Sequence, residues 1–152
     1  MEQSHITIIR PQLADLDNLA RLFDQYRVFY QQASDLDAAA QFLRNRLVKQ
    51  DSTIYAAQAD DQLIGFTQLY PSFSSVSMKA IWILNDLFVS PAYRNQGVAR
   101  KLIEMANHHA HATGAVRLAL STQHSNHAAQ QLYESIGYER DTEFIHYAFR
   151  VQ

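Results

Sequence analysis

The chain has 152 residues, 47% hydrophobic and 18% charged, which suffices for one globular domain with a sizeable core. Its formal net charge of -2 excludes a general electrostatic attraction for nucleic acid or for an anionic membrane, so a small-molecule partner is favoured. The chain contains no cysteine, which excludes a disulfide framework, thiol catalysis and a thiolate metal site.

No targeting segment is recognisable at the start of the sequence. Residues 1–5 lack a basic head followed by an apolar run, and no stretch approaches the length of a membrane span. No linker, internal repeat or low-complexity stretch divides the chain. We therefore expect a soluble cytoplasmic protein with a single domain over residues 1–152.

The N-terminal third predicts one strand and two helices. The strand covers about His5–Arg10, and apolar residues at helical spacing predict a helix over Ala14–Tyr30. Ser34, followed three residues later by the acidic Asp37, indicates the start of a second helix that ends near Lys49.

The middle of the chain predicts a hairpin and a central strand. Strands at Thr53–Ala59 and Gln62–Tyr70 flank the turn at residues 60–61. The stretch from Pro71 to Ser75 is expected to break the ladder. Ala80–Val89 is almost unbroken in its apolar character, which fits a strand covered on both faces.

A βαβ unit and a short C-terminal region follow. A helix is predicted from Gly97 to about Thr113, and Val116–Ser121 then returns as a strand parallel to Ala80–Val89 through a right-handed crossover. After a further short helix, Tyr138–Asp141 and Phe144–Val151 read as two final strands.

The turn before the helix at residue 97 is suited to an anion. The pattern Arg94-x-x-Gly97-x-Ala99 leaves little side chain where backbone N–H groups converge at the positive end of the helix dipole. The spacing excludes both the P-loop and the dinucleotide-binding glycine pattern. The turn is a candidate phosphate site, although glycine also serves many turns for backbone reasons alone.

A second group of residues lies about thirty positions later. Asn126 is a favoured N-cap, an apolar stripe follows it, and Gly137 suits a left-handed C-terminal cap. Asn126 and Tyr133 are two helical turns apart, so both can face one neighbour. A phenol on that face could donate a proton to a leaving group.

Together these motifs resemble the Gcn5-related N-acetyltransferase (GNAT) superfamily. The family shows a bulged strand, then Arg/Gln-x-x-Gly-x-Gly/Ala opening a helix, then a later Asn followed by Leu-Tyr-Glu-x-x-Gly-Phe/Tyr. Here they stand as residues 87–89, Arg94 to Ala99, and Asn126 with residues 132–138. The resemblance implies an α/β (α+β) GNAT fold: a mixed, mostly antiparallel sheet of six to seven strands with a central parallel pair, flanked by four helices.

The resemblance also implies acetyl-coenzyme A (acetyl-CoA) as the donor. Its pyrophosphate is expected on the backbone of residues 96–99, near the Arg94 and Arg100 side chains, and its pantetheine arm is expected to pair with the strand after the bulge. Asn126 is expected to hold the cofactor from the side of the parallel strand. The full set of expected cofactor-binding residues is Leu87, Phe88, Val89, Arg94, Asn95, Gln96, Gly97, Val98, Ala99, Arg100 and Asn126.

Three residues are candidates for the chemistry. Tyr133 is expected to protonate the departing thiolate, because a phenol and an alkyl thiol have similar pKa values. Asn85 and Asp86 interrupt an apolar strand, which favours a functional or hydrogen-bonded role. Related enzymes often carry Glu where this chain has Asn85, and an amide cannot be a base. Asp86 either relays the amine proton through a water or orients a loop, and both alternatives stay open.

The histidines and aromatic residues receive other interpretations. His108, His109 and His111 are expected to be solvated at the end of their helix, and no metal site is expected. The family builds its acceptor pocket where this chain places aromatic residues, namely Tyr26, Phe29, Tyr30, Tyr70 and Phe73.

The expected function is acetyl-CoA-dependent transfer of acetyl to a primary amine of a small molecule or amino acid, by direct attack through a tetrahedral intermediate. The alternatives are a coenzyme A-binding module without turnover and an acetyltransferase acting on protein or peptide lysine. The final predicted strand is apolar on both faces, which is a hazard at a sheet edge. A homodimer is therefore expected, with Phe144, Tyr147 and Phe149 at or near its two-fold interface and the acceptor pocket partly shaped by the partner.

Overall fold

The structure is a computed structural model that describes residues 5–152. The expectations for the first four residues lie outside this range. Internal contacts divide the chain into two compact parts, one ending at Ser121 and the other running from Thr122 to Gln152, and each is described by itself. A single domain over residues 1–152 stays a prediction.

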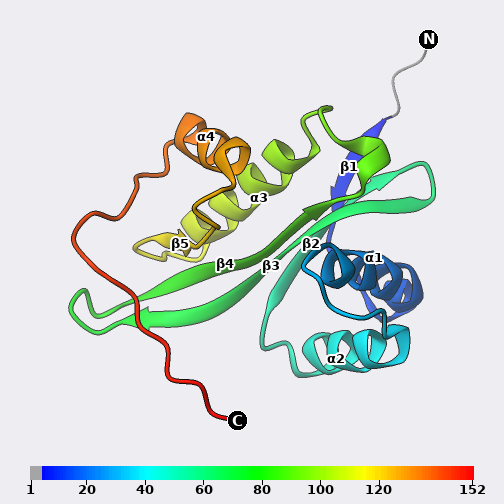
Figure 1. The fold of residues 1–152 in the computed structure, drawn as a ribbon, viewed down its shortest axis with the longest axis horizontal. Helices are drawn as coiled ribbons and strands as arrows, with labels where there is room; N and C mark the ends of the chain where they lie inside the picture. The colour runs from blue at the N-terminus through cyan, green and yellow to red at the C-terminus, as the bar shows by residue number, and fades with distance from the viewer. Residues whose placement is uncertain (1–4) are drawn as a thin grey trace. The chain divides into compact units, whose positions relative to one another are not determined.

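The first part is built around a five-stranded sheet (Figure 1). The strand order is β1-β2-β3-β4-β5, with every neighbouring pair antiparallel except the parallel β4 and β5. The strands are β1 (Ile6–Ile9), β2 (Thr53–Ala59), β3 (Gln62–Ser74), β4 (Lys79–Val89) and β5 (Leu118–Leu120). The α/β class and the parallel pair are confirmed.

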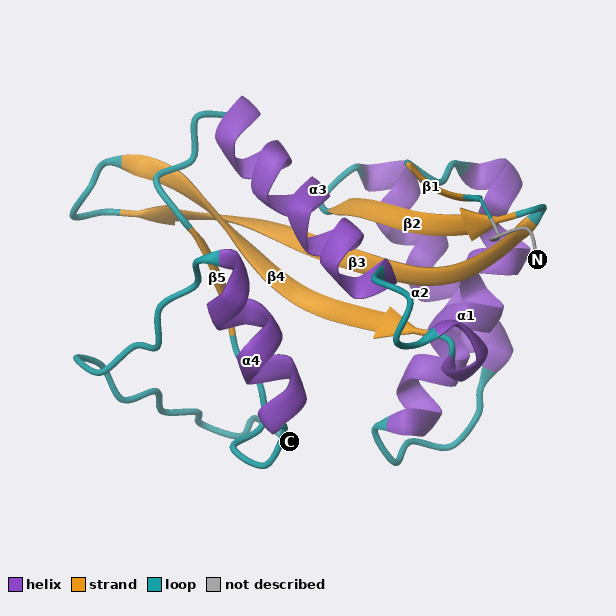
Figure 2. Cartoon of the chain, turned by 90° about the horizontal axis from the view of Figure 1, so that it is seen from above, coloured by secondary structure: helices purple, strands orange, loops and turns teal. Residues whose placement is uncertain are grey.

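Helices cover both faces of this sheet (Figure 2). Helices α1 (Leu16–Phe29) and α2 (Leu36–Lys49) cover one face, and α3 (Val98–Ala112) covers the other. Short 3-10 turns, η1 (Leu13–Asp15) and η2 (Pro91–Tyr93), precede α1 and α3. No helix among residues 5–152 is long and apolar enough to cross a bilayer.

The main core lies between the helical pair and the sheet. Leu19 and Leu43, from α1 and α2, are fully buried against Phe66 of β3 and Phe88 of β4. On the opposite face Gly65 lets α3 approach closely, because a Cβ there would lie 3.0 Å from the Phe88 carbonyl oxygen and 3.4 Å from Val98. Helix α3 also contacts β4, so this strand, which holds Asn85 and Asp86, is packed on both faces.

The sheet has five strands where six to seven were predicted, and its parallel pair lies at one edge and not at the centre. Residues 138–152 form no strand in the structure, so β5 is an edge strand instead of an interior one. The two final strands were inferred from alternation of apolar residues. Alternation shows which face a strand would bury, but a strand also needs a neighbour for its backbone groups.

The expected break at Pro71 is also wrong, because β3 continues to Ser74 with Pro71 opposite Trp82. The Trp82 N–H donates to the Arg117 carbonyl at 3.2 Å, away from β3. In an antiparallel ladder the backbone groups of the paired residue, Pro71, therefore also point away from β4. They point to the side of β3 where β2 has already ended, at the Thr53–Leu69 pair. The missing N–H of Pro71 therefore removes no ladder bond.

The start of α2 differs by one residue from the prediction. Asp35 is the N-cap, and its carboxylate accepts the Ala38 N–H at 3.1 Å. The Ser34 hydroxyl donates instead to Asp24 of α1 at 2.6 Å. Both residue types can cap a helix, so the sequence predicted the position only to within one residue.

The second part contains helix α4 (His127–Ile136) followed by an extended C-terminal segment. Asn126 caps the helix through its side-chain oxygen, which accepts the Ala129 N–H at 3.2 Å. Gly137 ends it in the left-handed conformation, with φ at +111°, and the Tyr138 N–H donates to the Tyr133 carbonyl at 3.0 Å. Both predicted caps are confirmed.

Candidate active site

Strand β4 carries a bulge at Asn85. Gln68 of β3 pairs with Asp86 and the next residue, Leu69, pairs with Leu84, so Asn85 is an extra residue without a partner on β3. A bulge bends its strand and changes the direction of the neighbouring side chains. Asn85 is exposed, whereas Asp86 is buried.

The Asp86 carboxylate is held by three side-chain donors. The Tyr26 hydroxyl donates to it at 2.8 Å, the Gln68 amide at 2.8 Å and the Asn85 amide at 3.1 Å. Burial, followed by the charge of Asp86, raises the pKa of Tyr26, so this phenol keeps its proton and acts as a donor. Three donors on one carboxylate fix its direction.

Further contacts anchor this cluster. Ser52 donates to the Gln68 side-chain oxygen at 2.8 Å, which directs the amide NH₂ of this fully buried glutamine to Asp86. The Thr67 hydroxyl donates to the Asp86 main-chain oxygen at 2.8 Å. Gln68 and Thr67 were missed in the sequence. The same pattern that indicated Asn85 and Asp86 could have found them, because Thr67 and Gln68 are also a polar pair within an otherwise apolar strand.

Beyond the bulge, one edge of β4 is open. Strand β5 pairs only with residues 82–84, so the following residues have a strand neighbour on the β3 side alone. The Ser90 N–H donates to β3 at Ile64, and alternation along the strand turns the N–H groups of Leu87 and Val89 to the open side. Phe88 turns its backbone to β3 and its ring to α1.

The turn after β4 leaves the start of α3 accessible. Gly97 is the N-cap with φ at +78°, no side chain caps it, and a Cβ there would meet nothing within 4 Å. The first amides of a helix have no partner within it, so the Val98 and Ala99 N–H groups suit an anion. This open, uncapped turn fits the pyrophosphate of acetyl-CoA.

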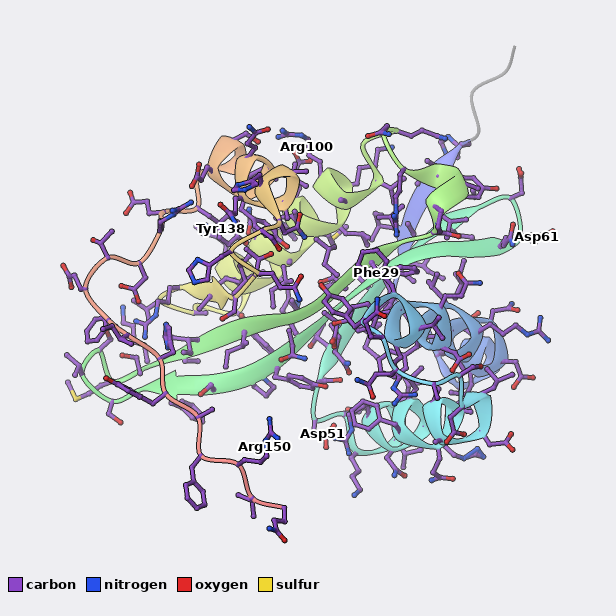
Figure 3. The ribbon with its side chains drawn as sticks, in the orientation of Figure 1. Phe29, Asp51, Asp61, Arg100, Tyr138 and Arg150 are labelled. Atoms are coloured by element: carbon purple, nitrogen blue, oxygen red, sulfur yellow. The ribbon has the colours of Figure 1, made fainter. Side chains whose placement is uncertain are left out.

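Arg94 has a more specific place than the sequence suggested. Its Nε donates to the Val89 carbonyl at 2.9 Å, and its guanidinium lies over the rings of Phe29 at 5.2 Å and Phe88 at 5.6 Å. Asn95 and Gln96 are exposed in the turn that follows. Arg100 is exposed at the first turn of α3 (Figure 3).

An open pocket lies between the end of α1 and the end of β4. Phe29, Phe88, Arg94 and Asp24 are among its lining residues, and Figure 3 shows Phe29 beside β4. Ring contacts of 5.2–6.1 Å join Phe29 and Phe88 to Tyr26 and Tyr30. Tyr70 and Phe73 were also expected at the acceptor pocket. Burial, followed by the Asp86 charge, raises the pKa of Tyr70. The Phe73 side chain is 80% exposed.

Tyr133 and Asn126 belong to the second part of the chain. Tyr133 is buried, and its ring lies 5.9 Å from that of Tyr138. Burial, followed by Tyr133, raises the pKa of Tyr138 to about 12. The Asn126 side-chain oxygen is committed to capping α4.

One of the three histidines of α3 is not solvated. His109 is half-buried, its Nδ1 lies 2.8 Å from the Tyr55 hydroxyl, and its ring lies 4.7 Å from that of Trp82. Burial lowers the pKa of His109, and Arg10 and His108 lower it further. In the described range 5–152, no three His, Cys, Asp or Glu side chains gather to hold a metal ion.

The bulged strand, its open edge and the uncapped helix start fit a class of protein that binds an acyl-CoA. Residues 16–138 match the acetyltransferase (GNAT) family, so the chain belongs to this family of acetyl-CoA-dependent N-acetyltransferases.

Three further proteins are similar to this one over nearly the whole chain. The N-acetyltransferase YhfO of Bacillus subtilis (strain 168) is 49% identical over 96% of this chain and 98% of its own length. A crystal structure of a probable acetyltransferase, 46% identical, superposes with a TM-score of 0.92 over 96% of this chain and 98% of that chain. An aminoglycoside N-acetyltransferase, AAC(6')-Iy in complex with CoA, shares the fold at 24% identity, with a TM-score of 0.81 over 99% and 98% of the two chains.

Proposed function

We propose that the protein transfers acetyl from acetyl-CoA to the primary amine of a small molecule or amino acid, by direct attack of the amine on the thioester carbonyl. The observation that carries this proposal is the bulge at Asn85. The bulge is followed directly by a fixed, buried carboxylate at Asp86 and then by the open strand edge at Leu87 and Val89. A fixed carboxylate and free backbone donors thus stand next to each other on one strand.

The donor is held by backbone groups along β4 and α3. The open N–H groups of Leu87 and Val89 pair with the pantetheine arm, and one of them polarises the thioester carbonyl as charge develops on its oxygen. The amides from Gln96 to Ala99 hold the pyrophosphate, with Arg94 and Arg100 near the phosphates. Asn95 completes the turn, and Asn126 holds the cofactor from the second part.

The acceptor occupies the pocket bordered by α1 and the aromatic residues around Phe88. Because Asp86 already receives three side-chain donors, it acts by orienting the bulge. The amine proton leaves to water, and Tyr133 protonates the departing thiolate. Asn85, the exposed bulge residue, lies nearest to the incoming amine.

Two other functions remain as alternatives: acetylation of protein or peptide lysine, and binding of coenzyme A without turnover. The pocket between α1 and β4 is lined mainly by aromatic and aliphatic side chains, which favours a compact acceptor over an extended peptide. A panel of amino acids, polyamines, aminoglycosides and a lysine peptide, compared by kcat/KM, tests the choice. We expect a small amine to have the highest value, and a preference for the peptide would contradict the proposal.

We further propose that the protein acts as a homodimer in the cytoplasm, with Phe144, Tyr147 and Phe149 at or near the two-fold interface. The support is the exposure of these three side chains, which ranges from 70% to 91%. Exposed apolar surface of this extent is typical of a contact with another chain.

A further inference from the structure

The open edge of β4 ends at an occupied carbonyl. Val89 lies opposite Gly65 of β3, and the next residue, Ser90, donates its N–H to the Ile64 carbonyl at 2.8 Å. Backbone direction alternates along an antiparallel ladder, so the Val89 N–H and carbonyl both point away from β3. The Arg94 Nε donates to this carbonyl at 2.9 Å. A side chain of the protein itself therefore takes the carbonyl that an added strand would bond at Val89.

Arg94 reaches back to the strand from the turn that leads to α3. In this turn the Tyr93 N–H donates to the Ser90 carbonyl at 2.9 Å. The Arg94 backbone is extended, with φ at -72° and ψ at 158°, and Asn95 is left-handed, with φ at +63°. The main chain thus continues toward α3 while the Arg94 side chain returns to Val89. One side chain therefore links the end of the open edge to the start of α3, the two places proposed to hold the donor.

The Arg94 guanidinium also lies over two aromatic rings, 5.2 Å from the centre of Phe29 and 5.6 Å from that of Phe88. The two rings lie 6.1 Å apart, and both border the pocket between α1 and β4. A planar guanidinium can lie over a ring and donate through Nε at the same time, which a lysine ammonium on its flexible stem cannot reproduce. The direction of the Arg94 side chain is therefore set by one carbonyl and two rings, and not by charge alone.

Arg100 offers a contrast from the same region. It is exposed on the first turn of α3, and Figure 3 shows it well apart from Phe29. The proposed role of Arg100 is electrostatic, since a cation near the start of the helix attracts phosphate. A lysine can serve the same purpose as a point charge.

From these contacts we infer that Arg94 is a positioning residue for the donor, which closes the open edge at Val89 and holds the end of β4 against Phe29 of α1. The inference rests on the proposed function and gives the Arg94 side chain a role other than neutralising phosphate. The pyrophosphate lies at the start of α3, so the nearest part of the arm meets the edge at Val89. Because the Val89 carbonyl is taken, the arm pairs from the Val89 N–H toward Leu87, which brings the thioester toward the bulge.

A donor fragment without phosphate tests this role. S-Acetyl-pantetheine has the thioester and the arm of acetyl-CoA but neither the pyrophosphate nor the nucleotide. Arg94→Gln should weaken the binding of both acetyl-CoA and the fragment on the order of tenfold, measured by calorimetry for the first and by NMR titration for the second. Arg100→Gln should weaken the binding of acetyl-CoA alone.

The outcomes of this comparison separate the inference from the proposed function. Unchanged affinity for the fragment in Arg94→Gln would make the side chain a phosphate ligand and would overturn the inference. Acetyl-CoA binding without fragment binding in the unsubstituted protein would overturn it as well, because the edge would then not hold the arm. Both results leave the proposed acetyl transfer intact. Failure of the unsubstituted protein to bind acetyl-CoA would instead contradict the proposed function itself.

Further substitutions separate geometry from charge. Arg94→Lys keeps the cation but loses the planar group, so it should weaken acetyl-CoA binding as much as Arg94→Gln does, whereas Arg100→Lys should retain the affinity. Phe29→Leu removes one ring and should weaken acetyl-CoA binding about threefold. Its effect should disappear in the Arg94→Gln background and multiply with that of Arg100→Gln. Full affinity in Arg94→Lys, or multiplying effects of Phe29→Leu and Arg94→Gln, would overturn the inference.

Discussion

The Tyr26 hydroxyl donates a 2.8 Å hydrogen bond to the Asp86 carboxylate, and this contact joins α1 to the bulge of β4. The two residues are sixty positions apart in the sequence. The helix that borders the proposed acceptor pocket and the strand whose open edge we propose for the donor are therefore linked through one half-buried polar contact.

Tyr26→Phe should lower the free energy of unfolding by about 1–3 kcal/mol, because a hydrogen bond to a charged group is lost while the charge stays buried. Urea denaturation measures this change. Tyr30→Phe is the control, since its ring also contacts the Tyr26 ring but it has no bond to Asp86. Equal stability of the Tyr26 variant and the unsubstituted protein would show that the contact contributes nothing.

Asp86→Asn should lower kcat/KM by a similar factor at every pH between about 6 and 9. An orienting carboxylate acts through its fixed charge and hydrogen bonds, whereas a base loses its effect as the acceptor amine becomes neutral by itself. A pH–rate profile with a saturating donor separates the two roles. A loss concentrated at low pH would show that Asp86 relays the proton.

Gly97→Glu should abolish the thermal stabilisation given by saturating acetyl-CoA, because it places bulk and negative charge at the uncapped start of α3. Gly114→Glu is a matched control. Both glycines have positive φ, +78° and +73°, and neither Cβ would meet an atom within 4 Å, so the backbone strain is comparable. Equal loss of stabilisation in both variants would move the phosphate site away from Gly97.

Tyr133→Phe should keep cofactor affinity and lower kcat on the order of a hundredfold, the usual scale for loss of a general acid. Tyr138→Phe, which removes the neighbouring hydroxyl, should leave kcat unchanged. Titration with acetyl-CoA and steady-state kinetics report the two effects separately. An unchanged kcat would give Tyr133 a packing role only.

His109 should make the protein less stable as the pH falls. Burial, Arg10 and His108 hold its pKa in the folded state below the usual 6.5, so the unfolded state binds the proton more readily. The stabilisation is complete above about pH 6.5 and is lost as the pH drops toward the lowered folded-state pKa. Denaturation of the unsubstituted protein and of His109→Phe between pH 7.5 and about 5 should show a shallower slope for the variant, and parallel slopes would contradict this assignment.

The sequence predicted the local features whose cause is local. Gly97, Asn126 and Gly137 were recognised as helix ends because capping depends on residue type and position. The polar pair Asn85 and Asp86 was recognised because its neighbours are apolar.

The partners of these residues depend on tertiary structure and were harder to predict. Tyr26 and Gln68 meet Asp86 only because α1 crosses β4 and the bulge sets the β3 register. Pro71 was read as a break, since the sequence does not show that β2 ends beside it. Residues 144–151 alternate as a strand does but form no strand in the structure, since alternation of side chains does not by itself provide a paired neighbour.

The most direct test of the proposed chemistry is to quantify both products by mass spectrometry after the full chain is incubated with acetyl-CoA and the best small amine of the panel. The account predicts N-acetylated amine and free coenzyme A in a one-to-one ratio, and no release of coenzyme A above background when the amine is omitted. Release at the same rate without the amine, or the absence of any acetylated small amine, would contradict it.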